Sequence, residues 1–164
     1  MSGGNVSSQF IAAAGDVASK ASILLGGERL SATPFDRGTY VQPTVVVGLP
    51  NEHGLNRDEL FLPFLSVLPL DGLFDAIENA NSSAFGLTAG IYTQDQGELD
   101  QFLSTIEAGV LYANRASGAT TGAWPGFQTF CGWKGSGTTG KGGLGAWYVP
   151  QFMREQSQTV VATR

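Results

Sequence analysis

Apolar residues in the N-terminal region recur at the three- and four-residue spacing of one helix face. These residues are Phe10, Ala14, Val17, Ala18 and Ala21. With the polar Ser7 and Ser8 just before them, they predict a modestly amphipathic helix over residues 7–21 that ends near Gly26 and Gly27.

Two β-prone segments follow this helix. Residues 40–48, YVQPTVVVG, are rich in β-branched side chains, and residues 64–68 predict a second strand. Pro43 has no N–H to donate to a ladder, so it places the first segment either at a sheet edge or at the start of a strand.

The clearest alternation of strands and helices comes next. Asp71 is a candidate cap for a helix carrying Leu73, Phe74 and Ile77. Residues 88–93 predict a strand and residues 110–113 another, and between them Asp95 and Glu98 resemble a capping box before an apolar helix. Strand, helix, strand, helix, strand is the order of a parallel sheet with crossover helices, so the predicted fold class is α/β.

Residues 122–145 have a different composition, with nine glycines among 24 residues, interleaved with aromatic rings. Large rings need surfaces to bury against, which favours an ordered functional loop over a flexible linker. Within it, GSGTTGKG from Gly135 resembles a phosphate-binding loop. Because no buried strand precedes it, no helix follows it, and Gly142 replaces the magnesium-binding hydroxyl, we reject the nucleotide loop.

Composition and charge narrow the function classes. The 164 residues are 42% hydrophobic and 14% charged, enough apolar material for one packed domain. The net charge is −5 and no Lys or Arg cluster occurs, which argues against nucleic-acid and anionic-membrane partners. No apolar run is long enough to span a membrane, so a soluble cytoplasmic protein is expected. The single Cys131 and single His53 leave no metal-ligand cluster, and we assign His53 no role.

Four segments together resemble the aldehyde dehydrogenase superfamily, in the family's order along the chain. They are RDELFLPFLSVLP at 57–69, AFGLTAGIYT at 84–93, AGVLYANR at 108–115 and GFQTFCGWKGSG at 126–137. The resemblance implies the fold of the catalytic domain, with residues 1–155 as its C-terminal part. It also implies that residues 156–164 are a tail whose strand-like segment QTVVA, residues 158–162, joins another subunit of a homo-oligomer.

Within that superfamily, TGAWPGFQTFCGWKGSG, residues 121–137, resembles the substrate-anchor loop of 1-pyrroline-5-carboxylate dehydrogenases. We call residues 121–130 of this stretch the anchor loop. The resemblance implies that an aldehyde bearing an amino-acid carboxylate, L-glutamate γ-semialdehyde, is oxidised to L-glutamate in proline catabolism. The N–H groups of Gly122 and Ala123 would hold the carboxylate, and Phe130 would pack against the methylenes. Without the resemblance, these residues would be read as an ordinary turn and a core ring.

The cofactor residues implied by the resemblance are Glu59 and Phe61. The family's glutamate accepts hydrogen bonds from the nicotinamide ribose of NAD or NADP, and its phenylalanine lies near the nicotinamide. The alternative is a solvated acid and a core ring. Two positions depart from the family pattern: Leu62 replaces a glycine after the phenylalanine, and Cys131 replaces the first glycine of a pair.

The family's nucleophilic cysteine, its catalytic base and its dinucleotide-binding domain have no counterpart in these residues. Cys131 has no neighbouring histidine, so we interpret it as a small buried or semi-buried thiol and assign no catalytic residue. The chain is therefore expected to be inactive alone and to act with the missing N-terminal part of the enzyme. The alternatives are a non-catalytic binding or assembly module, or a folded fragment without a function of its own.

Overall fold

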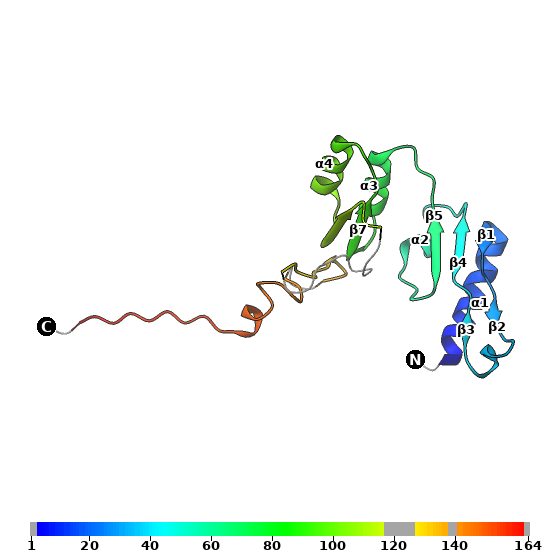
Figure 1. Ribbon diagram of the computed structural model, residues 1–164, viewed down its shortest axis with the longest axis horizontal. Helices are drawn as coiled ribbons and strands as arrows, with labels where there is room; N and C mark the ends of the chain where they lie inside the picture. The colour runs from blue at the N-terminus through cyan, green and yellow to red at the C-terminus, as the bar shows by residue number, and fades with distance from the viewer. Residues whose placement is uncertain (1–2, 117–126, 138–140, 163–164) are drawn as a thin grey trace. The chain divides into compact units, whose positions relative to one another are not determined.

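The computed structural model describes residues 3–116, 127–137 and 141–162 (Figure 1). It divides into two compact units, Met1–Asp71 and Gly72–Arg164. Both units combine helices with strands, as the sequence predicts for an α/β protein, and each is described by itself below.

Helix α1, Gly3–Lys20, provides much of the apolar surface of the first unit. Phe10 and Val17 are fully buried on one helix face, so the predicted amphipathic helix is confirmed. Its predicted end is wrong, because strand β1, Ser22–Leu25, begins almost immediately after it. Gly26 and Gly27, with φ of 80° and 90°, therefore turn the chain after a strand and not after the helix.

The sheet of the first unit has the order β1-β4-β5. Strands β4, Thr44–Val47, and β5, Phe64–Val67, run parallel, whereas β1 is antiparallel to β4. The short strands β2, Arg29–Leu30, and β3, Tyr40–Val41, form a separate antiparallel pair. Pro43 lies directly before β4, so the interpretation of Pro43 as a strand start is confirmed.

The core of the first unit lies between α1 and one face of this sheet. Val17, Val46 and Leu49 form its centre, and the rings of Phe10 and Phe64 lie 5.0 Å apart between centroids. The opposite face is apolar and open: Leu25, Val45 and Leu65 form one row across the three strands. Leu25 is 62% exposed and Leu65 is 59% exposed.

The second unit contains the predicted strand–helix–strand repeat. Strands β7, Thr88–Ile91, and β8, Val110–Ala113, are parallel and are joined by helix α4, Gln96–Thr105. Helix α3, Leu73–Asn81, lies beside α4 (Figure 1). The core of this unit is formed by Ile77, Phe102 and Ile106.

Among the described residues, the parallel pairs are β4–β5 and β7–β8, and the other pairs are antiparallel. Strand β6, Phe85–Gly86, is antiparallel to β9, Trp133–Lys134. The predicted parallel pairing with a crossover helix is thus present at β7–α4–β8, within sheets that are mixed or antiparallel elsewhere. The α/β class itself is confirmed.

The helix caps differ in part from the sequence expectation. Asp71 does not cap α3: the N-cap is Gly72, which has no side chain to bond the first turn. Asp95 does cap α4, its Oδ1 accepting from the Glu98 N–H at 2.9 Å. The reciprocal half of the capping box is missing, since the Glu98 carboxylate binds the Thr93 hydroxyl.

The C-terminal region carries little regular structure. A short 3₁₀ helix spans Pro150–Phe152, and residues 153–162 form neither helix nor strand. The strand expected over residues 158–162 is therefore not formed within the described chain, where Val160 is 92% exposed. Its pairing with another subunit stays a prediction, as does the boundary at residue 155.

Candidate functional site

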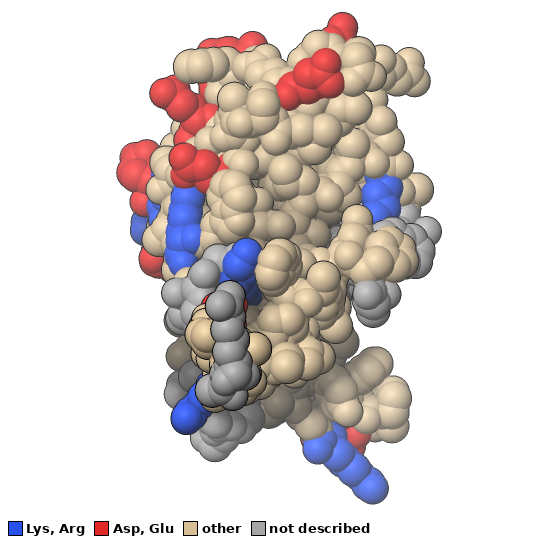
Figure 2. Space-filling view, turned by 90° about the vertical axis from the view of Figure 1, so that its left-hand side faces the viewer, with Lys and Arg blue, Asp and Glu red and all other residues tan. Residues whose placement is uncertain are grey.

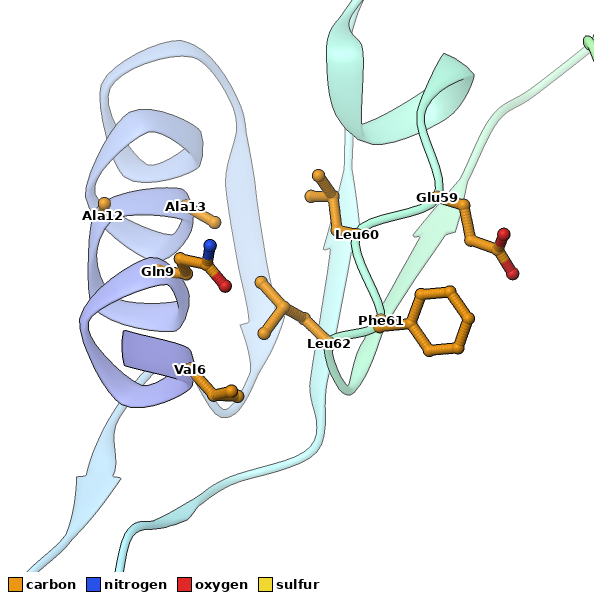
Figure 3. Close-up of a pocket in the computed structure, with 8 residues that line it drawn as sticks. All are labelled: Val6, Gln9, Ala12, Ala13, Glu59, Leu60, Phe61 and Leu62. Carbon is orange, nitrogen blue, oxygen red and sulfur yellow. The ribbon is translucent and has the colours of Figure 1, made fainter. Parts of the chain in front are cut away.

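A hollow in the first unit lies between α1 and the segment that leads into β5 (Figure 3). Its volume is about 690 Å³. The residues lining it are Val6, Gln9, Ala12, Ala13, Glu59, Leu60, Phe61 and Leu62. Two sequence-predicted site residues, Glu59 and Phe61, therefore lie together at the rim of one concave surface.

Side chains alternate in direction along residues 59–62. Leu60 and Leu62 point toward α1, whereas Glu59 and Phe61 point away from the helix, on the same side as each other (Figure 3). This arrangement presents a carboxylate and an aromatic ring together, the pair that the resemblance assigns to the nicotinamide ribose and the nicotinamide.

Phe61 has an unusual backbone conformation. Its φ is 52°, in the left-handed region that bulky residues rarely adopt, and its side chain is 86% exposed. The ring is therefore not part of the described core of the first unit. A strained backbone that displays an apolar ring to the outside is typical of a functional position.

Leu62 occupies the position at which the family pattern has a glycine. The left-handed conformation falls on Phe61 and not on residue 62, so a side chain at position 62 meets no backbone strain. Leu62 is half-buried and points toward α1. The leucine therefore packs on the helix side while Phe61 stays displayed.

His53, to which the sequence assigned no role, organises the approach to this segment. Its Nδ1 accepts from the Leu55 N–H at 3.1 Å, which caps the short helix α2, Gly54–Arg57. Its Nε2 lies 2.9 Å from the Asp16 carboxylate of α1. His53 thus ties α1 to the helix that immediately precedes Glu59, through a contact spanning 37 residues that no local pattern reveals.

Asp16 is the centre of a small charged cluster. Lys20 lies 2.6 Å from its other oxygen, one helical turn along α1. The hydrogen bond from Lys20, followed by that from His53, lowers the pKa of Asp16 below its ordinary value. A second hollow of about 430 Å³ borders this cluster and shares Ala13 and Leu60 with the first.

In the second unit, the structure describes the last part of the anchor loop, residues 127–130, and a main-chain hydrogen bond holds its final residue. The Phe130 N–H donates to the Gly143 oxygen at 2.8 Å, and the Phe130 side chain is half-buried. The next residue, Cys131, is buried, as predicted for a structural thiol. A Cβ on Gly109 would lie 1.5 Å from the Cys131 oxygen, so only glycine fits at position 109.

Motif residues after the anchor loop bind the second unit's own helices and strands. The Lys134 ammonium donates to main-chain oxygens of Asn81 and Ser83 near the end of α3, and it pairs with Glu107 at 2.6 Å. The Ser136 hydroxyl accepts from the Gly86 N–H at 3.1 Å. The lysine and serine therefore secure the segment structurally.

The structure also bears on the rejected nucleotide loop. After Lys141 the described chain forms a bridge at Gly143 and then turns, and it contains no helix before the 3₁₀ turn at Pro150. The helix N-terminus that a phosphate loop requires is thus missing from residues 141–149. Lys141 instead lies 4.5 Å from the centroid of the Trp147 ring.

The predicted site residues fall into separately described parts of the chain. Glu59 and Phe61 belong to the first unit and Phe130 to the second. Gly122 and Ala123 lie outside the described residues. What sequence reasoning missed is the support around these positions, from His53 and Asp16 in the first unit and from Lys134 in the second.

The described residues were also compared with the requirements of a basic patch, a metal site and a membrane-spanning helix. On the face shown in Figure 2, the Lys and Arg side chains stand apart and form no continuous basic patch. Among the described residues, no three His, Cys, Asp or Glu side chains are grouped so that they could hold a metal ion. No helix within residues 3–116, 127–137 and 141–162 is long and apolar enough to cross a membrane.

Comparison with known proteins places this geometry in a family context. The family model described as the aldehyde dehydrogenase family matches residues 9–157. A 3,6-anhydro-α-L-galactose dehydrogenase of Streptomyces coelicolor is 35% identical over 127 residues, which cover 77% of this chain and 25% of that protein. An α-ketoglutaric semialdehyde dehydrogenase of Bacillus subtilis is 34% identical over 97 residues, covering 59% of this chain and 20% of that protein.

Solved structures agree with these sequence matches. A 1-pyrroline-5-carboxylate dehydrogenase of Thermus thermophilus superposes with a TM-score of 0.78 at 32% identity, covering 90% of this chain and 27% of that one. A 3,6-anhydro-L-galactose dehydrogenase in complex with NADP gives 0.78 at 30% identity, over 90% of this chain and 30% of that one. The chain thus spans a quarter or less of the length of the curated relatives it matches.

Proposed function

We propose, from the premise that this chain belongs to the aldehyde dehydrogenase family, that it forms part of an enzyme that oxidises an aldehyde to a carboxylate with NAD or NADP. The observation that carries the proposal is the joint display of Glu59 and Phe61 on one side of the segment before β5 (Figure 3). The ring of Phe61 is exposed, and its backbone is held in a costly conformation.

The residues present fit a nicotinamide riboside. A carboxylate offers only acceptors, so Glu59 suits the two hydroxyls of a ribose, and the apolar face of Phe61 suits the edge of a nicotinamide ring. The dinucleotide, when bound, accepts the hydride that leaves the substrate carbon. The role of Glu59 and Phe61 is to orient its nicotinamide end.

For the substrate, we propose L-glutamate γ-semialdehyde, which the enzyme converts to L-glutamate in proline catabolism. The N–H groups of Gly122 and Ala123 bind the substrate carboxylate, and Phe130 packs against its methylene groups. Support comes from the anchor-loop sequence and from the 32% identity to a 1-pyrroline-5-carboxylate dehydrogenase. The Bacillus subtilis relative is likewise named for a semialdehyde that carries a carboxylate.

A second candidate substrate is a neutral sugar aldehyde. It is favoured by the 35% identity to a 3,6-anhydro-α-L-galactose dehydrogenase. Such a substrate has no carboxylate, so the N–H groups at residues 122 and 123 would contribute much less to its binding. The two candidates therefore differ in how strongly turnover depends on the anchor loop.

We further propose that the rest of an aldehyde dehydrogenase covers the open face of the β1-β4-β5 sheet. The row formed by Leu25, Val45 and Leu65 is apolar, and its two outer side chains are largely exposed. The N-terminal part of the enzyme is the partner we expect there, with further copies forming a homo-oligomer. A non-catalytic assembly module remains the alternative function, and a cytoplasmic location stays a prediction.

The test uses the complete active enzyme that contains this chain, assayed with L-glutamate γ-semialdehyde, 3,6-anhydro-L-galactose and a simple aliphatic aldehyde. Ala123→Pro removes one N–H donor, so the KM for the carboxylated aldehyde should rise about tenfold or more. The KM for the aliphatic aldehyde should change much less. Equal losses with every aldehyde would show general misfolding and refute the assignment of the anchor loop.

A further inference from the structure

His53 joins helix α1 to the short helix α2, which ends just before residues 59–62, the stretch that we call the riboside segment. We propose that His53 is a positioning residue: its bond to Asp16 holds the riboside segment in place and thereby sets the affinity for the nicotinamide end of the dinucleotide. The inference rests on the proposed function for the identity of the ligand. Its structural part rests on contacts within the first unit alone.

The two ring nitrogens of His53 bind different partners. Nδ1 accepts from the Leu55 N–H at 3.1 Å, so this nitrogen carries no proton of its own. The proton of the neutral ring is then on Nε2, which donates to the Asp16 carboxylate at 2.9 Å. One side chain thus caps α2 and binds α1, and it does both only in this tautomer.

The bond between His53 and Asp16 is the contact of this cluster that joins two elements. The histidine side chain is 12% exposed, and a largely buried donor to an ionised carboxylate forms a strong hydrogen bond. Lys20, the other partner of Asp16, belongs to the same helix and is 50% exposed. Removing Lys20 therefore changes the surroundings of Asp16 without detaching α2 from α1.

Helix α2 is continuous with the start of the riboside segment. The Asp58 N–H donates to the Gly54 oxygen at 2.7 Å, which closes the last turn of α2 directly before Glu59. Beyond the other end of the segment, the Pro63 oxygen accepts from the Thr44 N–H at 2.8 Å, which joins the chain to β4. The riboside segment is therefore held between α2 and the sheet, and a shift of α2 moves its first residue.

Leu60 lies over the part of α1 that also binds His53. Its side chain points toward α1 (Figure 3). With Ala13, it lines both the hollow of about 690 Å³ and the hollow of about 430 Å³, and the second of these also borders His53 and Asp16. Ala13 and Asp16 are three residues apart and so are neighbours on one helix face. The separation of α1 and α2 thus affects Leu60 and the residues on either side of it.

The position of the riboside segment matters because its proposed contacts are directional. Hydrogen bonds from two ribose hydroxyls to the Glu59 carboxylate weaken steeply as their angles and distances depart from the optimum. Phe61 is displayed by a left-handed backbone, a conformation that persists only where the surrounding structure maintains it. Loosening the start of the segment should therefore weaken binding of the dinucleotide much more than binding of the aldehyde.

The experiment compares four variants of the complete enzyme that contains this chain, assayed with NAD or NADP, whichever supports turnover. His53→Ala and Asp16→Ala should each raise the KM for the dinucleotide about five- to tenfold, with less than about twofold change in the KM for the aldehyde. Asp16→Asn keeps an oxygen that accepts from Nε2, and Lys20→Met leaves the bond to His53 intact. Both controls should stay within about twofold of the wild type.

Combining His53→Ala with Asp16→Ala tests whether the two residues act through one bond. The double variant should be little worse than the worse single variant, because each change removes the same contact. Effects of the two changes that multiply would overturn the proposal. So would an Asp16→Ala enzyme with the wild-type KM for the dinucleotide, or a Lys20→Met enzyme with the same rise as Asp16→Ala.

Glu59→Ala separates this inference from the proposed function. If this change leaves the KM for the dinucleotide unaltered, the proposed ligand of the riboside segment is wrong, and hydrogen exchange then decides the role of His53. In the complete enzyme, His53→Ala and Asp16→Ala should speed exchange over residues 54–61, whereas Asp16→Asn should not. Unchanged exchange in all variants would refute His53 as a positioning residue.

Discussion

The Lys134 ammonium lies 2.6 Å from Oε2 of Glu107, although the two residues differ in environment: the lysine side chain is 23% exposed and the glutamate side chain 50%. The same ammonium holds main-chain oxygens near the end of α3. Lys134→Met should therefore lower the free energy of unfolding by about 2–3 kcal/mol, because charged hydrogen bonds to oxygens are lost. Glu107→Gln should cost less than about 1 kcal/mol. Urea denaturation measures both, and equal costs would contradict this ranking.

Lowering the pH should reduce the stability of the first unit, because Asp16 becomes protonated. Its pKa in the folded chain is lowered, chiefly by the hydrogen bond from Lys20, relative to the ordinary value of 3.8. The stabilisation is therefore complete above that value and is lost as the pH falls through the lower folded pKa. Thermal unfolding between about pH 5 and pH 2 should show a smaller decline for Asp16→Asn than for the wild type. Lys20→Met should reproduce most of this effect, and parallel curves for all three proteins would count against it.

Replacing Phe61 by glycine should maintain or raise the stability of the fold and weaken binding of the dinucleotide. Phe61→Gly removes a bulky residue from a left-handed conformation, so the free energy of unfolding should stay level or rise by up to about 1 kcal/mol. Phe74→Gly is a suitable control, because Phe74 is 64% exposed within helix α3. That control should lose about 1 kcal/mol. In the complete enzyme, Phe61→Gly should raise the KM for the dinucleotide, and unchanged cofactor kinetics would argue against the proposed role of Phe61.

The isolated chain should show no aldehyde dehydrogenase activity with NAD and L-glutamate γ-semialdehyde. Cys131, its one cysteine, is buried beside Gly109 and Gly142, where an aldehyde has little access. Formation of NADH is the measurement. Turnover that Cys131→Ser abolishes would make this thiol the nucleophile, and turnover that survives the change would place the chemistry elsewhere in the chain.

The C-terminal tail should promote self-association. Residues 158–162 are β-prone, and the described tail forms no strand of its own, so its main-chain groups are free to pair with another chain. Light scattering should show a dimer or larger species for the 164-residue chain. A chain ending at Glu155 should shift toward monomer. A full-length chain that stays monomeric at tens of micromolar would refute this prediction.

Local patterns predicted the elements whose apolar residues follow a single period. The helix carrying Phe10 and Val17, and the strands flanking α4, agree with the sequence expectation. Strand β1 was missed because Ile23–Leu25 is a short apolar run, which fits a helix end and a strand equally well. The N-cap at Gly72 was also missed, since a nearby aspartate is normally the better cap.

The support around the candidate site could not be read from the sequence. His53 reaches Asp16 across 37 residues, and Lys134 reaches Asn81 across 53, so neither pair leaves a local periodic signal. The resemblance pointed to Glu59 and Phe61, but no residue pattern around Phe61 signals its left-handed conformation, which favours glycine. Pairing between distant segments is a property of the assembled fold.

Strand β8 holds a landmark at each end: Gly109, pressed against Cys131, and Asn114, bonded to Thr93. The sequence between Asn114 and Cys131, residues 116–129, can therefore be treated as an exchangeable cassette. Grafting the corresponding stretch of a relative with another substrate, while residues 109, 114 and 131 are left untouched, is a direct route to altered aldehyde preference. Random libraries that spread into those three positions would waste most of their members on misfolded chains.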